Sequence, residues 1–218
     1  MHIPDGFIDL KTAATTGIFS ISGIIFAVIK VKQYFKARVI VLMGIFAALI
    51  FAAQMLNFNI LGGTSGHLLG AALATIILGP YAGGIIITAV LLVQAFAFGD
   101  GGISALGANT FNMAIVAVIS AYLVYKLITK FSKSRAVFYC AVAFSSWFSV
   151  VVASIFTSIE LAVSNTYTLG LTLSSMVIIH MVIGLGEAAI TVIIIAFIDK
   201  VKPDLIFTRN WDRKVEAS

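Results

Sequence analysis

Long apolar stretches, separated by short polar or glycine-rich breaks, run through most of this chain. Such stretches approach the roughly 20 residues that an α-helix needs to cross a bilayer. The strict apolar–polar alternation of a membrane β-barrel is absent from the sequence. The pattern therefore predicts an all-α, polytopic membrane bundle of about seven transmembrane helices. These helices are expected at residues 12–30, 38–57, 66–79, 81–98, 108–128, 136–162 and 174–199.

The chain is expected to form one integral-membrane domain, 1–218. Within it, 1–11 is an N-terminal segment, 12–199 the helix bundle, and 200–218 a basic, amphipathic tail at the cytoplasmic surface. The third and fourth helices are short and meet at Gly79-Pro80, because a proline ends the preceding helix. We expect these two helices to tilt or to stop partway through the bundle.

Thirteen of the fourteen Lys and Arg residues fall in three clusters between the apolar runs. The clusters are Lys30, Lys32, Lys36 and Arg38; Lys126, Lys130, Lys133 and Arg135; and Lys200, Lys202, Arg209, Arg213 and Lys214. Basic loops stay in the cytoplasm, so an odd number of crossings places the N-terminus outside and the C-terminus inside. The outer face then carries the loops 58–65, 99–107 and 163–173 beside the start of the chain.

Composition agrees with this picture, since 61% of residues are hydrophobic, 11% are charged, and the mean hydropathy is +1.10. The net charge of +5 is explained by the three clusters, so it does not indicate a nucleic-acid partner. Cys140 is the single cysteine and is expected to pack in an apolar helix. No basic segment precedes the first apolar run, and Asp5 and Asp9 argue against a cleaved signal peptide.

The first two residues, Met1-His2, carry the most specific chemistry. The terminal amine, the amide nitrogen of His2 and its imidazole can close a five- and a six-membered chelate ring without long-loop entropy. Three nitrogens in a plane suit Ni(II) or Cu(II) once a fourth is added. The alternative is that Met1 is only the start residue and His2 has no metal role. Pro4, Asp5 and Gly6 are turn formers that let this segment fold back onto the bundle.

His67 is the candidate for the fourth nitrogen. It follows a glycine-rich stretch on the outer face and is expected to open the third helix, with Thr64 or Ser65 as the cap. The topology that places it beside Met1-His2 was inferred from lysines and arginines alone. The alternative for His67 by itself is a partly hydrated residue at a helix end.

Three motifs extend beyond these residues: Met1-His2-Ile3-Pro4-Asp5-Gly6-Phe7, Gly66-His67-Leu68-Leu69-Gly70, and Ala105-Leu106-Gly107-Ala108-Asn109-Thr110-Phe111-Asn112-Met113. With these motifs and a Gly-Leu-Gly-Glu turn at 184–187, the whole chain resembles the substrate-capture subunit of energy-coupling-factor nickel/cobalt transporters, the NikM/CbiM family. The resemblance implies a multi-pass protein of the prokaryotic cell membrane whose N-terminal segment inserts into the bundle. It also implies Ni(II) or Co(II) as the transported substrate, held by Met1, His2 and His67, with no organic cofactor.

Other polar residues are candidates for supporting roles. Asn109 and Asn112 are expected to orient a ligating imidazole, to pin the N-terminal segment through its backbone, or simply to cap the fifth helix. Asp100 is interpreted as a solvated loop charge. His180 is expected to make a hydrogen bond to a neighbouring helix, with a metal contact as the alternative. Glu187 is interpreted as a buried polar tie or a proton-linked group.

The chain contains no Gly-Lys pair and therefore no phosphate-binding loop, so ATP-driven uptake would need other subunits. By the resemblance, these are a membrane scaffold subunit, ATP-binding cassette ATPases and a small accessory membrane subunit. The small-residue pair Ala48 and Ala52 is a candidate contact with the scaffold, although such pairs also serve internal packing. We therefore expect a non-enzymatic capture subunit for Ni(II). Its alternatives are a cobalt uptake subunit supporting cobalamin biosynthesis, a vitamin-binding subunit and an intramembrane metalloenzyme.

Overall fold

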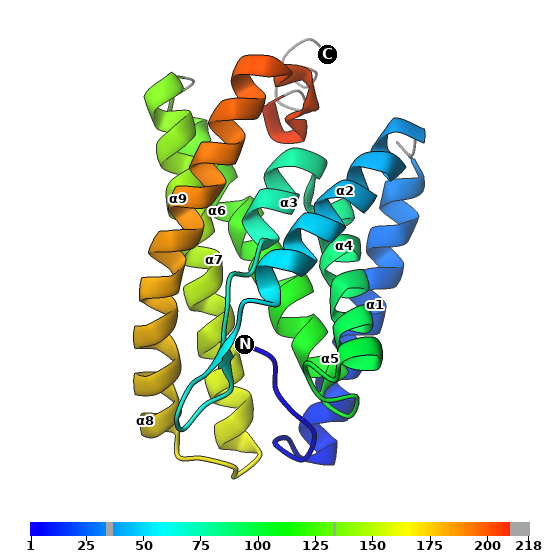
Figure 1. Cartoon of the computed structure of the whole chain (residues 1–218), viewed down its shortest axis with the longest axis vertical. Coiled ribbons are helices and arrows are strands. Elements are labelled where there is room, and N and C mark those ends of the chain that lie inside the picture. The colour runs from blue at the N-terminus through cyan, green and yellow to red at the C-terminus, as the bar shows by residue number, and fades with distance from the viewer. Residues whose placement is uncertain (34–36, 133, 210–218) are drawn as a thin grey trace.

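The computed structural model describes residues 1–33, 37–132 and 134–209, and these form an upright bundle of helices (Figure 1). The α-helices are α1 (Leu10–Lys32), α2 (Ala37–Gln54), α3 (Ala71–Leu78), α4 (Pro80–Val93), α5 (Leu106–Thr110), α6 (Ala117–Phe131), α7 (Arg135–Val163), α8 (Leu169–Thr172) and α9 (Ile178–Val201). The π-helical turns η1 (Gln94–Phe98), η2 (Phe111–Val116) and η3 (Leu173–Val177) continue or join helices, and η4 (Pro203–Leu205) is a 3-10 turn.

Each of the seven predicted segments contains a helix, and in the part of the chain that the structure describes five continuous helices are long and apolar enough to cross a membrane. These are Leu10–Lys32, Pro80–Phe98, Leu106–Phe131, Arg135–Val163 and Leu169–Val201. The third segment differs most from its prediction. Its helix begins at Ala71 rather than at 66, and α3 has only eight residues, or about 12 Å of length. It therefore stops partway, as its shortness suggested.

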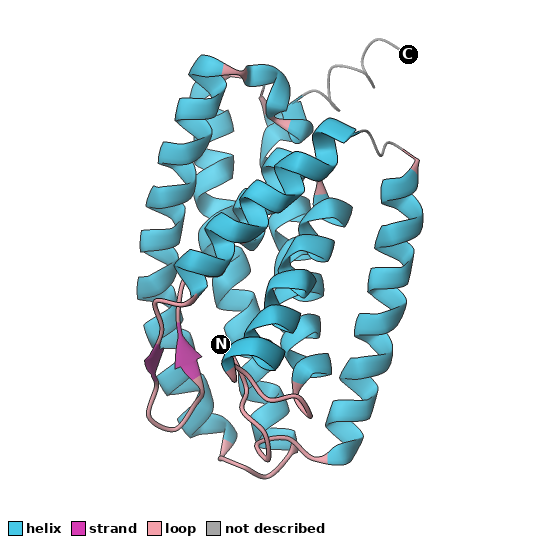
Figure 2. Ribbon diagram, turned by 45° about the vertical axis from the view of Figure 1, so that its right-hand side comes forward, coloured by secondary structure: helices cyan, strands magenta, loops and turns pink. Residues whose placement is uncertain are grey.

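The late start of α3 follows from a small hairpin before it. Strands β1 (Phe58–Asn59) and β2 (Ser65–Gly66) pair antiparallel, so the chain is still extended where a helix was expected (Figure 2). Gly70 then takes φ +76°, a left-handed conformation that glycine adopts without strain, and α3 begins after it. All eight residues of α3 are buried, which places this short helix in the core of the bundle.

The two ends of the bundle agree with the predicted topology. Figure 1 shows the α1–α2 and α6–α7 connections at the same end as the C-terminal segment. The hairpin, the 99–105 loop, the α7–α8 loop and the residues before α1 lie at the other end. Lys36, Lys133, Arg213 and Lys214 lie outside the described residues, as does the side chain of Arg38. The described basic residues of the three clusters therefore share one end, as expected for a cytoplasmic face.

The described part of the tail packs on the bundle instead of lying free at its surface. Ile206 is fully buried, and the Thr208 hydroxyl donates to the carbonyl of Ile76 at the end of α3 (3.3 Å). Arg209 forms an ion pair with the buried carboxylate of Asp199 on α9. The remainder of the predicted tail, 210–218, lies outside the described residues.

Candidate metal centre

The first three residues lie inside the bundle, between the hairpin and the helices (Figure 2). Met1 and Ile3 are fully buried, and His2 is 4% exposed. The Ile3 amide donates to the side-chain oxygen of Asn109 (2.8 Å), and the Asn109 amide donates back to the Ile3 carbonyl (3.1 Å). The Gly102 amide donates to the same carbonyl (2.8 Å). The segment is therefore clamped through its main chain, which is why it can enter an apolar bundle.

Residues after Ile3 turn the chain back out toward α1, as the turn formers predicted. Gly6 has φ +81° within this turn, and the Asp5 carboxylate accepts from the amide and hydroxyl of Ser104 (2.7 and 2.6 Å). Gly102 allows the close approach, because a Cβ there would lie 2.3 Å from the Asp5 nitrogen. Asp9 then caps α1 by accepting from the Thr12 amide (3.0 Å).

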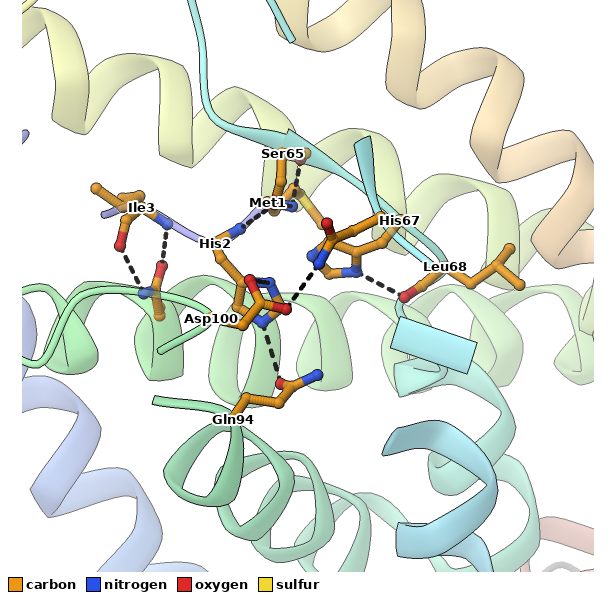
Figure 3. A network of polar contacts seen from close by, with 10 residues as sticks. Met1, His2, Ile3, Ser65, His67, Leu68, Gln94 and Asp100 are labelled. Atoms are coloured by element: carbon orange, nitrogen blue, oxygen red, sulfur yellow. Dashed lines mark hydrogen bonds and ion pairs between the residues drawn. The ribbon is translucent and has the colours of Figure 1, made fainter. Parts of the chain in front are cut away.

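Ser65, on strand β2, receives the start of the chain (Figure 3). The Met1 amine donates to its carbonyl and to its hydroxyl oxygen, and the His2 amide also donates to that hydroxyl (3.0 Å). Ser65 therefore accepts hydrogen bonds from two of the nitrogens that are candidates for metal ligands. The prediction that it caps a helix is wrong. Burial lowers the pKa of the Met1 amine well below its usual value, although the Asp100 carboxylate opposes the shift. The lowered pKa favours the uncharged form of the amine, which is the form that can bind a cation.

The His2 imidazole lies between two polar side chains. Its Nε2 hydrogen-bonds to the Gln94 side-chain oxygen (3.1 Å), and its Nδ1 is 3.3 Å from an Asp100 oxygen without hydrogen-bond geometry (Figure 3). In the tautomer that donates from Nε2 to the Gln94 oxygen, Nδ1 keeps its lone pair. Nδ1 is the nitrogen that a six-membered chelate ring requires. Burial lowers the pKa of His2 despite the opposing carboxylate of Asp100.

His67 lies in the extended stretch between β2 and α3, not at a helix start as expected. Its ring stacks on that of His2 with a centroid distance of 4.4 Å and an interplanar angle of 20°. Its Nδ1 donates to the Leu68 carbonyl (2.7 Å), which leaves a lone pair on a buried Nε2 that has no partner among the described residues. Burial lowers the pKa of His67 well below its usual value, so the ring is neutral.

Among the described residues, no group of three or more His, Cys, Asp or Glu side chains is placed to hold a metal. A cation site here would therefore need main-chain nitrogen as well. The structure brings together a buried terminal amine, the His2 amide, and two stacked imidazoles that each have one ring nitrogen without a hydrogen-bond partner among the described residues.

Asp100 and Gln94 are parts of the site that the sequence analysis did not identify. The interpretation of Asp100 as a solvated loop charge is wrong, because its carboxylate faces His2 and accepts from the Asn57 amide (2.7 Å). Burial alone would raise the pKa of Asp100, but these contacts outweigh burial and lower it. Gln94 is fully buried in an apolar helix, and a lone amide in such a run was the signal that could have found it.

The two asparagines have different roles. Asn109 pins the N-terminal segment through its backbone, one of the alternatives considered. Asn112 does not, because its amide donates to Glu160 (2.6 Å) and to the Thr157 hydroxyl (3.2 Å), which ties it to α7.

His180 and Glu187 both lie buried on α9. Among the described residues, the expected hydrogen bond from His180 to a neighbouring helix is not found: its Nδ1 donates to the Met176 carbonyl of the preceding turn (2.7 Å), and its Nε2 has no partner. Glu187 is a buried polar tie: its carboxylate accepts the Leu69 and Gly70 amides just before α3 (2.5 and 2.9 Å). It thereby satisfies donors that would otherwise be unpaired at a buried helix start.

Fold and site together define a multi-pass helical membrane protein that encloses its own N-terminus beside two histidines. A family model described as cobalt uptake substrate-specific transmembrane region, CbiM, matches residues 2–205. The chain is 44% identical to a putative fused nickel transport protein NikMN of Archaeoglobus fulgidus, over 94% of this chain and 68% of that one. It is 29% identical to the cobalt transport protein CbiM of Thermosipho melanesiensis, over 95% and 90% of the two chains.

A crystal structure of a truncated transition metal transporter superposes with a TM-score of 0.88 at 33% identity, covering 92% of this chain and 99% of that one. The chain therefore belongs to the CbiM family of cobalt and nickel transport proteins. It is a membrane transport protein and not an enzyme, which confirms the family and fold expected from the sequence.

Proposed function

We propose that this chain captures Ni(II) or Co(II) from the outer side of the membrane for ATP-driven uptake. The ion is held in a plane by the Met1 amine, the amide and imidazole nitrogens of His2, and the imidazole of His67. The observation that carries this proposal is the burial of the Met1 amine beside two stacked imidazoles, each of which has one ring nitrogen without a hydrogen-bond partner among the described residues.

The chemistry of these donors supports the assignment. The amine and the His2 amide are adjacent, so a five-membered ring closes between them, and His2 Nδ1 closes the second ring without a change of tautomer. His67 then supplies the fourth nitrogen from another element. Burial lowers the pKa of the amine and of both rings, which reduces the competition of protons with a cation at these nitrogens.

Charge balance also supports the site. Binding through the His2 amide releases its proton, so a divalent cation with an amidate leaves one net positive charge in a buried place. Asp100, ionised and next to His2, compensates that charge. Gln94 fixes the opposite face of the ring, as partners of ligating histidines commonly do.

Nickel is the first candidate because four planar nitrogens stabilise low-spin Ni(II), and Ni(II) stands above Co(II) in the divalent affinity order. Cobalt uptake in support of cobalamin biosynthesis is the second candidate function, favoured by the description of the matching family.

The proposed partners come from the resemblance to capture subunits of energy-coupling-factor transporters. They are ATP-binding cassette ATPases, a membrane scaffold subunit and a small accessory membrane subunit, and the ATPases would supply the phosphate-binding loop that this sequence does not contain. Ala48 and Ala52 are exposed on one face of α2, where they are accessible to a scaffold helix.

Metal analysis and visible spectroscopy of protein purified with an unmodified N-terminus test the proposal. We expect one Ni(II) per chain and a weak yellow absorption typical of planar Ni(II). His67→Ala and His2→Ala should abolish tight binding, whereas Asn59→Ala, an exposed change in the same hairpin, should not. Metal-free protein, or tight binding retained in the histidine variants, would contradict the proposal and favour an organic substrate.

A further inference from the structure

The stretch that carries His67 runs beside η3 and α9 in a regular order. A Cβ on Gly63 would lie 2.5 Å from the Met176 sulfur, and one on Gly66 would lie 3.0 Å from Ile183. Farther along, the Leu69 amide donates a hydrogen bond to the Glu187 carboxylate. Ser65, which holds the Met1 amine, therefore lies beside the part of η3 and α9 between Met176 and Ile183.

His180 lies in this part of the helix, between Met176 and Ile183. It is four residues after Met176 and three before Ile183, so the three share one face of the helix. This is the face that the Met176 and Ile183 contacts turn toward the His67 stretch. His180 is therefore a near neighbour of the proposed site.

The ring of His180 has one nitrogen whose lone pair is available to a cation. Its Nδ1 proton is donated to the Met176 carbonyl, so the lone pair is on Nε2. The residue is 0% exposed, and Nε2 has no hydrogen-bond partner among the described residues. A buried nitrogen acceptor left without a partner is costly, and each such group calls for an explanation. Met176 belongs to the π-helical turn η3, a feature that often accompanies functional sites.

We propose that His180 Nε2 is a fifth donor to a bound Co(II) ion and that it thereby stabilises Co(II) selectively over Ni(II). The inference rests on the proposed function, because the other four nitrogens are those of Met1, His2 and His67. Those four fill a plane, so a fifth donor binds on its axis.

The electronic structure of the two ions explains the selectivity. Planar low-spin Ni(II) has a filled orbital along the axis, which repels a fifth donor. Low-spin Co(II) has one electron fewer in that orbital, so it accepts an axial nitrogen. A chain with four planar nitrogens alone would favour nickel strongly. Because His180 strengthens the binding of Co(II) and not that of Ni(II), it reduces the difference in affinity between the two metals.

Electron paramagnetic resonance of the Co(II)-loaded protein tests this directly, in a buffer without nitrogen ligands. One axial ¹⁴N should split each cobalt line of the parallel region into three, and ¹⁵N-histidine labelling should convert each triplet into a doublet. His180→Leu should abolish the splitting and weaken Co(II) binding at least tenfold. The same variant should change Ni(II) affinity less than threefold and keep the planar Ni(II) spectrum, which also reports that it folds.

Absence of the triplet in the unmodified protein, insensitivity of the triplet to ¹⁵N-histidine, or its persistence in His180→Leu would overturn the inference. Because His2 and His67 fill the plane in the proposed site, conversion of the triplet into a doublet assigns the axial nitrogen to His180 even if His180→Leu fails to fold. Failure of the proposed function looks different, since Co(II) would then not bind, or would bind without dependence on His2 and His67.

Discussion

Asn109 offers the clearest measure of how much the docked N-terminal segment contributes to cation binding. In Asn109→Ala, the buried Ile3 amide loses its acceptor, while the Ile3 carbonyl keeps the Gly102 amide. An orphaned buried donor costs about 1–2 kcal/mol, and the second lost hydrogen bond adds about 0.5–1 kcal/mol. An undocked segment cannot bring its amine to His67, so this free energy is lost from metal binding.

The expected result is Ni(II) affinity weakened on the order of 10- to 100-fold. Isothermal titration calorimetry on detergent-purified protein measures it, and the thermal unfolding midpoint reports whether the bundle remains intact. Asn59→Ala, an exposed asparagine on strand β1, is the matched control and should bind like the unmodified protein. Asn109→Ala with unchanged affinity and unchanged stability would refute the idea that the clamp holds the donor set in place.

Three further predictions concern charge and pH. Ni(II) affinity should rise about tenfold for each unit by which the pH is raised, because one amide proton leaves per bound ion. At acid pH the affinity should fall more steeply, since the amine and both rings, whose pKa values burial lowers, must then also lose protons to bind. A flat profile in competition titrations would exclude amide ligation. Asp100→Asn should weaken Ni(II) binding roughly tenfold by leaving the buried positive charge uncompensated, whereas Asp204→Asn at the opposite end should not. Glu187→Gln should lower the unfolding midpoint by several degrees. One of the two amides before α3, those of Leu69 and Gly70, would then face an NH₂ group instead of an oxygen, which costs roughly 1–3 kcal/mol of folding free energy. An unchanged midpoint would show that this cap is dispensable.

The sequence predicted the helices well because long apolar runs and basic clusters report directly on the bilayer. It failed at 65–70, where Ser65-Gly66 pairs with the first hairpin strand and Gly70 turns left-handed before α3. Pairing between two-residue strands is decided by contacts across the fold, so local periodicity could not indicate it. Glu187, far along the chain, supplies the cap that the local residues do not.

For the site, local chemistry identified Met1, His2 and His67, because adjacent donors at the start of a chain are visible without a fold. The partners of those residues were not visible. Asp100 followed by two glycines has the composition of a solvated loop, and only the inward course of the N-terminal segment brings it to His2. Asn112 was grouped with Asn109 by spacing, yet three residues of helix turn the two side chains toward different partners.

The central claim is that the free amine of Met1 is itself a ligand. Its most direct test compares Ni(II) affinity of the unmodified chain with that of a variant carrying one additional leading residue, or with N-terminally acetylated protein. We expect both changes to reduce affinity by at least a thousandfold and to abolish the planar Ni(II) absorption, while the bundle stays folded. Tight Ni(II) binding with an unaltered spectrum in either protein would contradict the account.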